Sequence, residues 1–149
     1  MPYLALLDRL RNFLKEPTAV LVICGYSFRD DHINEVLSQG LQYTRTSIAF
    51  AFLYEELSKH PQGVSLANLH ANMKLVAPRQ GIIGGTTVDW CAPSQGHSKE
   101  VLGNAIEWVE VDKIGEYERQ SLKCNLGDFA HLAEYFARLL SHQSALGQD

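Results

Sequence analysis

The feature that most constrains the fold is a short apolar run that ends in a glycine turn and continues into an amphipathic helix. Residues 18–24 read TAVLVIC, a run that predicts a strand covered on both faces, as in parallel sheets. The segment GYSFRD, residues 25–30, breaks this run. A helical pattern follows, with either Asp30 or Asp31 as its N-cap. Its apolar face consists of Ile33, Val36, Leu37 and Leu41.

Helical and strand patterns continue to alternate along the chain. A helix over residues 3–14 precedes the first strand. Buried strands are expected at 46–53 and 74–78, with a mostly helical or looped segment between them that is interrupted at residues 61–63. The later expectations are a loop or hairpin at 79–85, a strand at 86–90, a surface loop at 91–99, an edge strand at 106–111, a helix at 128–140 and a frayed tail at 141–149. The last helix has an apolar stripe formed by Phe129, Leu132, Ala133, Phe136 and Leu140.

This order of elements predicts an α/β fold. We expect residues 1–149 to form a single domain, a partial Rossmann-like three-layer arrangement with a mostly parallel sheet flanked by helices. A chain of this length suits one domain with an ordinary core. Open α/β sheets bind ligands outside the carboxyl ends of their strands. Residues 25–34 are therefore the first place to look for a site.

Composition argues against several classes of function. The chain has 13 Lys and Arg against 17 Asp and Glu, without a basic stripe, so no direct contact with nucleic acid is expected. No apolar run reaches the ~18–20 residues of a membrane span. Asp8 and Arg9 interrupt the apolar start, which argues against a signal peptide and for a cytoplasmic protein. The three cysteines and six histidines lack metal-ligand spacing, so no metal is expected.

Several chemically capable side chains have ordinary explanations. Cys24 ends an apolar run and is interpreted as a small buried hydrophobe. His70 is interpreted as structural, and His131 is expected to be exposed on the polar flank of the last helix. Trp90 and Trp108 are interpreted as packing residues. The many acidic residues have the spacing of a solvated face rather than of a hydrolase pair.

The turn after the first strand has the residue types of a nucleotide site. Gly25 allows a sharp turn and a close approach by a ligand, and Ser27 adds a hydroxyl. Free amides at the start of the following helix attract phosphate or ribose oxygens. Asp31, His32 and Asn34 cluster around the first helical turn. An ordinary alternative stays open, in which the glycine serves only the turn and the polar residues cap the helix.

Four stretches of the chain resemble one known family. The segment LVICGYSFRDDHINEVL is similar to the SIR2-like domain of bacterial proteins, zinc-less relatives of sirtuins that are often found in anti-phage systems. The sharpest part of the resemblance is GYSF-x-D-x-HIN. VAPRQGIIGG with its nearby Trp90 and LGDFAHLAEYFARLL also agree, as does the opening LLDRLRNFL.

The resemblance implies a Rossmann-like sheet that binds NAD. By this analogy the turn at Gly25, Tyr26 and Ser27 lies against the ribose and phosphates of NAD, supported by amides near Phe28. The turn at Gly127 and Asp128 would lie near the adenosine end. The full set of expected cofactor-binding residues is Gly25, Tyr26, Ser27, Phe28, Asp31, His32, Asn34, Gly127 and Asp128.

Two parts of the family pattern are missing from this sequence. The Gly-Ala-Gly turn and the catalytic Asn and His, the latter in Leu-His-Gly, come before the GYS turn in family order, yet only 24 residues precede Gly25. The pair Leu69-His70 follows that turn and continues with Ala71, so the catalytic role is not transferred to it. The chain resembles the C-terminal half of the domain, and no catalytic residue is assigned.

These observations leave two functions open. The first is the NAD-binding portion of an NAD hydrolase that is inactive alone, because cleavage of the nicotinamide–ribose bond needs a general base and an oriented water. The alternative is a non-catalytic module that binds a nucleotide or ADP-ribose, or another protein. An uncovered edge at strand 18–24 or 46–53 would favour a homo-oligomer or pairing with the missing N-terminal half.

Overall fold

The computed structural model describes residues 2–43, 46–90, 103–114 and 117–146. It contains a five-stranded sheet in the order β1-β2-β3-β4-β5 and a separate two-stranded sheet. The α/β class is confirmed, and the sheet is mixed: β1, β2 and β3 are parallel, whereas β4 and β5 are added antiparallel. The strands are β1 (Val20–Cys24), β2 (Ile48–Phe52), β3 (Met73–Val76), β4 (Gln80–Ile83) and β5 (Thr86–Asp89).

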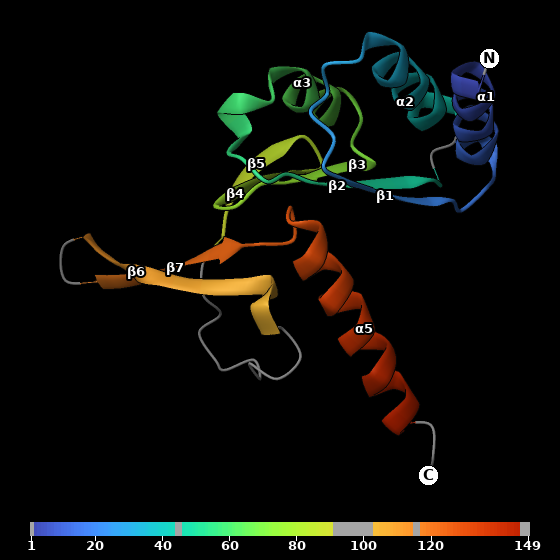
Figure 1. Cartoon of the computed structure of the whole chain (residues 1–149). Helices are drawn as coiled ribbons and strands as arrows, with labels where there is room; N and C mark the ends of the chain where they lie inside the picture. Colours follow the sequence, from blue (N-terminus) through green and yellow to red (C-terminus); the bar gives the residue numbers. More distant parts are fainter. Residues whose placement is uncertain (1, 44–45, 91–102, 115–116, 147–149) are drawn as a thin grey trace.

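Three helices cover one face of this sheet (Figure 1). They are α1 (Pro2–Lys15), α2 (Asp31–Tyr43) and α3 (Pro61–Leu69), with a short 3-10 helix, η1 (Leu57–Lys59), before α3. The expected interruption at 61–63 is wrong, because Pro61 begins α3. Proline suits the first position of a helix, where its missing N–H has no partner to lose.

The core lies between these helices and the sheet. On β2 the side chains that face the helices are the small Ala49 and Ala51, both fully buried. Met73 and Leu75 of β3 lie next to them and are also fully buried. The helices contribute Leu14 from α1 and the expected apolar face of α2, of which Val36, Leu37 and Leu41 are buried.

The opposite face of the sheet is open near β1. Val20 and Val22 of β1 are 58% and 42% exposed, so the expectation that this strand is covered on both faces is wrong. In the described part of the chain β1 pairs with β2 alone, so the expected uncovered edge lies at β1 and not at the central β2. The register places Val20 beside Ile48 and Val22 beside Phe50, which joins these side chains into one apolar surface.

The C-terminal elements lie below the sheet in Figure 1. After η2 (Gly103–Ala105), β6 (Ile106–Ile114) extends the strand expected at 106–111 and pairs with an unexpected strand, β7 (Tyr117–Cys124). Helix α5 (Phe129–Leu146) includes most of the tail that was expected to fray. The loop expected at 91–99, which contains Cys91, lies outside the described residues.

The apolar stripe of α5 is only partly covered. Leu132 is buried, whereas Phe129, Phe136 and Leu140 are exposed. Periodicity correctly predicted which residues share a face of this helix. It did not predict that most of this face lies away from the sheet.

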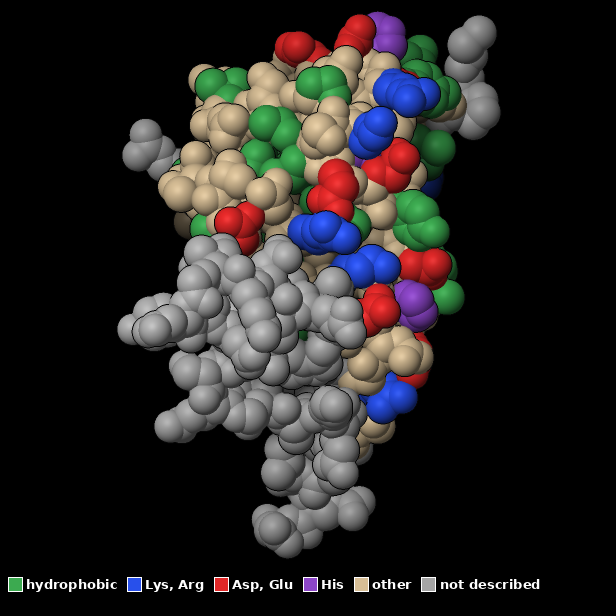
Figure 2. All heavy atoms as spheres, turned by 90° about the vertical axis from the view of Figure 1, so that its left-hand side faces the viewer, with side chains coloured by type: hydrophobic (Ala, Val, Ile, Leu, Met, Phe, Trp, Pro, Cys, Tyr) green, Lys and Arg blue, Asp and Glu red, His purple; other side chains and the backbone are tan. Residues whose placement is uncertain are grey.

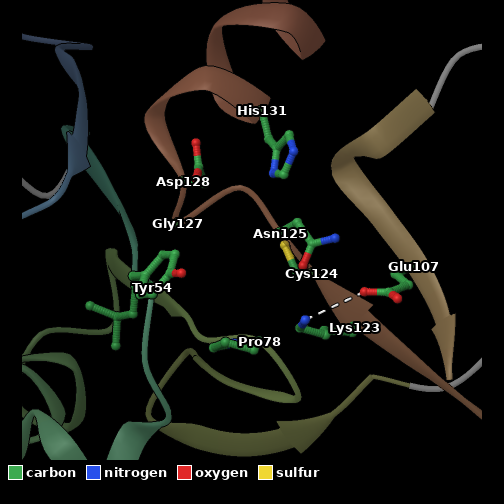
Figure 3. Close-up of a pocket in the computed structure, with 10 residues that line it drawn as sticks. Tyr54, Pro78, Glu107, Lys123, Cys124, Asn125, Gly127, Asp128 and His131 are labelled. Atoms are coloured by element: carbon green, nitrogen blue, oxygen red, sulfur yellow. Dashed lines mark hydrogen bonds and ion pairs between the residues drawn. The ribbon is translucent and has the colours of Figure 1, made fainter.

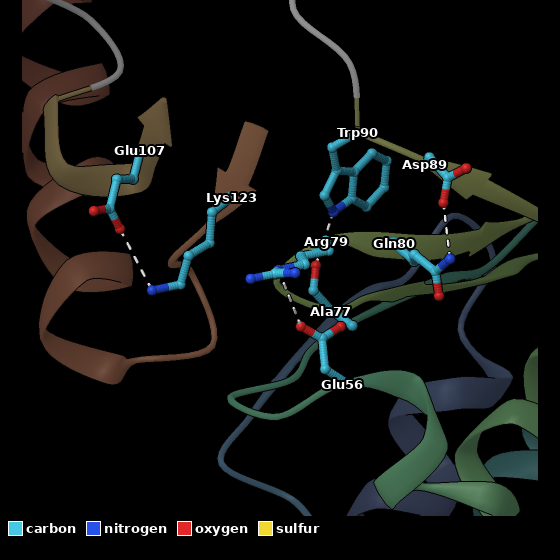
Figure 4. A network of polar contacts seen from close by, with 8 residues as sticks. All are labelled: Glu56, Ala77, Arg79, Gln80, Asp89, Trp90, Glu107 and Lys123. Atoms are coloured by element: carbon cyan, nitrogen blue, oxygen red, sulfur yellow. Dashed lines mark hydrogen bonds and ion pairs between the residues drawn. The ribbon is translucent and has the colours of Figure 1, made fainter. Parts of the chain in front are cut away.

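The β4–β5 hairpin is tied to the sheet by polar contacts shown in Figure 4. The Trp90 indole N–H donates to the carbonyl oxygen of Ala77 at 2.8 Å, and the ring lies against Gly81. Gln80 Nε2 donates to Asp89 across the hairpin at 2.8 Å. The side chain of Trp108 lies outside the described residues. The hairpin resolves the alternatives left open for residues 79–85.

Within these described segments, no helix combines the length and apolar character needed to cross a membrane.

Candidate functional site

Two neighbouring cavities lie at the carboxyl ends of the parallel strands. The larger, about 370 Å³, is bordered by Leu53, Tyr54 and the segment from Lys123 to His131. The smaller, about 180 Å³, is bordered by the Gly25–Ser27 turn and by His60. Leu53 and Tyr54, which follow β2, line both cavities. The cavities therefore adjoin one another at the edge where α/β sheets bind ligands.

The turn that borders the smaller cavity is held rigidly from inside. Gly25 has a φ of 71° and Phe28 a φ of 59°, which places a fully buried aromatic residue in the left-handed region. Asn34 Nδ2 donates to the Phe28 carbonyl at 2.8 Å. The Tyr26 hydroxyl donates to Asn34 Oδ1 at 2.9 Å and lies 3.0 Å from the Asp30 carbonyl. Asn34 and Tyr26 thus shape the turn.

The phenol of Tyr26 stays protonated in this setting. Burial raises the pKa of Tyr26 to about 12, and the nearby Asp30 carboxylate adds to that rise. The hydroxyl therefore remains a donor across the physiological pH range. Ser27 is exposed and lines the smaller cavity.

The start of α2 is already capped by a carboxylate. Asp30 Oδ1 accepts from the amides of His32 and Ile33 at 3.0 and 3.2 Å, so Asp30, rather than Asp31, is the N-cap. The Tyr3 hydroxyl donates to the other oxygen at 2.8 Å. These contacts, led by the bond from Tyr3, lower the pKa of Asp30. The amides of His32 and Ile33, which were expected to attract phosphate, are therefore already bonded to Asp30. The side chains of Asp31 and His32 are exposed.

The second expected turn reaches the same edge from the far end of the sequence. A Cβ added at Gly127 would overlap the backbone carbonyl of Leu53, so only glycine fits this close approach. The Cys24 thiol, at the end of β1, lies 3.4 Å from the Gly127 carbonyl. Asp128 accepts from the Ala130 amide at 2.8 Å and caps α5. The structure therefore brings Gly25–Ser27 and Gly127–Asp128 to one edge.

The larger cavity is lined by polar groups of both signs (Figure 3). Lys123 and Glu107 form an ion pair at 3.4 Å on its rim. The His131 ring points from α5 toward Cys124 and Asn125. His131 is half-buried, which corrects the expectation of an exposed side chain, and its Nδ1 is buried without a hydrogen-bond partner in the described structure.

The two described thiols are not poised for nucleophilic chemistry. Burial, together with the Asp128 carboxylate, raises the pKa of Cys24. Burial likewise raises the pKa of Cys124. The thiolate is the reactive form of cysteine, so both groups stay largely inert. Cys24 was expected to be buried but is half-buried, and its Sγ lies near carbonyl oxygens.

Sequence reasoning missed His60, which borders the smaller cavity. This residue is only 7% exposed, and its Nδ1 lies 3.4 Å from the Ser27 carbonyl. Its Nε2 is buried without a hydrogen-bond partner in the described structure. The available signal was a His-Pro pair that starts a helix shortly after a buried strand. Metal-ligand spacing, which the six histidines lack, does not reveal it.

Charges on the described surface are mixed in sign. On the face shown in Figure 2, blue Lys and Arg side chains lie next to red Asp and Glu side chains. Elsewhere in the structure Arg79 and Glu56 form an ion pair at 3.8 Å, which Figure 4 shows. No cluster of three or more metal-ligating side chains occurs among the residues described. The arrangement offers hydrogen-bonding groups around two adjacent hollows rather than a concentrated charge.

No protein-family model matches this chain, and no curated protein matches it significantly.

Proposed function

We propose that the chain is the NAD-binding portion of a SIR2-like NAD hydrolase domain, and that it binds NAD or ADP-ribose without cleaving it alone. The observation that carries this proposal is the meeting of the Gly25–Ser27 and Gly127–Asp128 turns beside adjoining cavities. These turns lie about a hundred residues apart in sequence. The resemblance relates one to the ribose and phosphates and the other to the adenosine end.

The size and chemistry of the hollows fit part of such a ligand. Ligand pockets commonly measure about 300–1,000 Å³, and the larger cavity, about 370 Å³, falls near the lower end. His60 and His131 line the two cavities, and each has a buried ring nitrogen, Nε2 and Nδ1 respectively, without a hydrogen-bond partner in the described structure. Buried polar atoms normally have partners, so unpaired ones beside a hollow favour a polar ligand.

Each group has a definite task in this proposal. Gly25 allows a close approach to the backbone, Ser27 bonds a ribose or phosphate oxygen, and Asp128 accepts from a ribose hydroxyl through its second oxygen. NAD itself supplies the nicotinamide–ribose bond that an intact hydrolase would cleave. Among the described residues that line the two cavities, no hydroxyl or thiol is hydrogen-bonded to a base, so we expect binding without nicotinamide release.

Isothermal titration of ADP-ribose and NAD, with chromatography of the mixture for nicotinamide, tests this function. We expect binding and no release. Ser27→Ala should weaken binding about fivefold to tenfold, the equivalent of one lost hydrogen bond of about 1–1.4 kcal/mol. Ser65→Ala, on the exposed side of α3, is the matched control. Absence of binding by the unaltered chain contradicts the proposal, and release of nicotinamide contradicts its inactive state.

The open sheet face favours an interaction role beside ligand binding. Val20, Val22, Ile48 and Phe50 form an apolar surface next to the unpaired edge of β1. Such surfaces commonly mark contact with another chain. We propose that a second copy of this chain covers it.

Sedimentation velocity on the unaltered chain and on Val22→Lys tests self-association. We expect the unaltered chain to associate and the variant to raise the dissociation constant at least about tenfold, because an unpaired buried charge costs more than about 1.4 kcal/mol. Leu4→Lys, at an exposed position of α1 on the other side of the sheet, is the control. A monomeric unaltered chain would exclude the second copy as the covering partner.

A further inference from the structure

His60 occupies a position that packing alone does not explain. It lies between η1 and α3, and its ring meets Phe28 edge-on with centroids 6.5 Å apart. It is 7% exposed. One ring nitrogen, Nε2, has no hydrogen-bond partner in the described structure, although a phenyl ring would fill the same space without that cost.

The partner of the other nitrogen determines what Nε2 can do. Nδ1 lies 3.4 Å from the Ser27 carbonyl oxygen. A carbonyl oxygen only accepts, so Nδ1 must carry the hydrogen of this contact. A ring that carries its hydrogen on Nδ1 presents a lone pair at Nε2, which can accept a hydrogen bond.

The residues around His60 determine which ligand group can donate a hydrogen bond to Nε2. The cavity that His60 borders also contains Gly25, Ser27, Tyr54 and Glu55. A phosphate oxygen cannot donate to Nε2 at neutral pH, and the Glu55 carboxylate on the same cavity repels it further. A ribose hydroxyl can donate to Nε2 and carries no charge. The cavity next to the Gly25–Ser27 turn is therefore suited to a sugar hydroxyl rather than to a phosphate.

We infer that His60 binds the ligand directly, with Nε2 accepting a hydrogen bond from a ribose hydroxyl of a nucleotide held at the Gly25–Ser27 turn. This inference rests on the proposed function and adds a residue and an orientation to it. The ribose lies in the smaller cavity, and the phosphates extend toward the larger one. Ser27 is then fixed twice, because its carbonyl holds the His60 ring while its hydroxyl faces the ligand.

Two histidines at opposite ends of α3 give a matched test. His70 ends this helix as His60 precedes it, and it is equally buried, at 8% exposed. Its Nε2, however, already bonds Ser38 Oγ at 2.9 Å. Titration of ADP-ribose should show about a tenfold loss of affinity for His60→Phe, which removes the acceptor. His60→Gln keeps an acceptor at the Nε2 position and should stay within about threefold, as should His70→Gln.

Two further readouts separate a contact from a merely structural role. Thermal unfolding of each variant shows whether it folds, and His60→Gln keeps the test usable if His60→Phe does not. In ¹⁵N spectra of the unaltered chain, His60 should show the Nδ1–H tautomer, and its Nε2 signal should move upfield when ADP-ribose is added. Inorganic pyrophosphate is the probe for phosphate contact, and its binding should not depend on His60.

The outcomes distinguish this inference from the function on which it rests. Equal ADP-ribose affinity in a folded His60→Phe variant, or an unmoved Nε2 signal, overturns the inference while the proposed function stands. A parallel loss of pyrophosphate binding assigns His60 to phosphate and also overturns it. If the unaltered chain binds no ADP-ribose at all, the proposed function falls and the inference falls with it.

Discussion

Gly127→Ala is expected to lower the free energy of unfolding by about 3 kcal/mol and to abolish ADP-ribose binding. The added Cβ would overlap the Leu53 carbonyl, and the nearest other atom is the Tyr54 amide nitrogen at 2.5 Å. Both belong to the backbone, so no side-chain rotation relieves the overlap. The turn must move away from the end of β2, which opens the larger cavity and displaces Asp128.

Urea unfolding and calorimetric titration of ADP-ribose measure the two effects. Asn125→Ala is a suitable control for the unfolding measurement, because it truncates a side chain two residues away whose one described bond, to the Asn104 carbonyl, is long at 3.4 Å. We expect this control to unfold within about 1 kcal/mol of the unaltered chain. Near-normal stability and binding in Gly127→Ala would show that the 125–128 turn does not lie against Leu53 in solution.

Phe28→Ala is expected to lower the free energy of unfolding by about 3–5 kcal/mol. Phe28 is fully buried against Tyr26 and His60, with ring centroids 4.7 and 6.5 Å away. Its positive φ is unfavourable for a bulky residue, so burial of the ring must offset a local strain of about 1–3 kcal/mol. Truncation removes the burial and keeps the backbone conformation strained, since alanine has a Cβ too.

The Phe28→Ala variant should also bind ADP-ribose more weakly than the unaltered chain under conditions where the variant is fully folded. Without the ring, the Gly25–Ser27 turn and His60 lose the surface that positions both. Urea unfolding gives the stability, and titration at a temperature where the variant stays folded gives the affinity. Arg29→Ala, the exposed neighbour, should change neither by more than about 0.5 kcal/mol. A folded Phe28→Ala variant with unchanged affinity would separate this turn from the binding site.

Most of the regular elements could be predicted from local patterns. The apolar spacing in α2 and the continuous run in β1 are signals contained within a dozen residues, and both predictions are confirmed. The predicted ends of helices were wrong where a residue type is compatible with both a helix and a loop. Pro61 was interpreted as a break and instead begins α3, and the polar tail after Leu140 continues the helix to Leu146. Strand β7 was missed because its sequence, YERQSLKC, carries no apolar alternation.

Some features of the candidate site could likewise be predicted from the sequence, and others could not. Gly25 and Ser27 follow a predicted strand, so their place at its carboxyl end follows from the pattern. The capping role of Asp30 was one of two alternatives, and only the geometry chose between them. Asn34 could be placed near the turn, yet its bonds to Phe28 and Tyr26 depend on a left-handed backbone that no local pattern indicates.

By itself, the sequence determined which segments are helical or extended and where the chain turns, because periodicity and turn residues act between near neighbours. Only the tertiary structure decided which faces are covered. It exposed Val22 on the open sheet face and placed Gly127, 103 residues from Cys24 in sequence, against the end of β2. It also left His60 Nε2 buried without a partner. Such contacts depend on how separate elements pack, and packing between distant residues leaves no periodic signal in the chain.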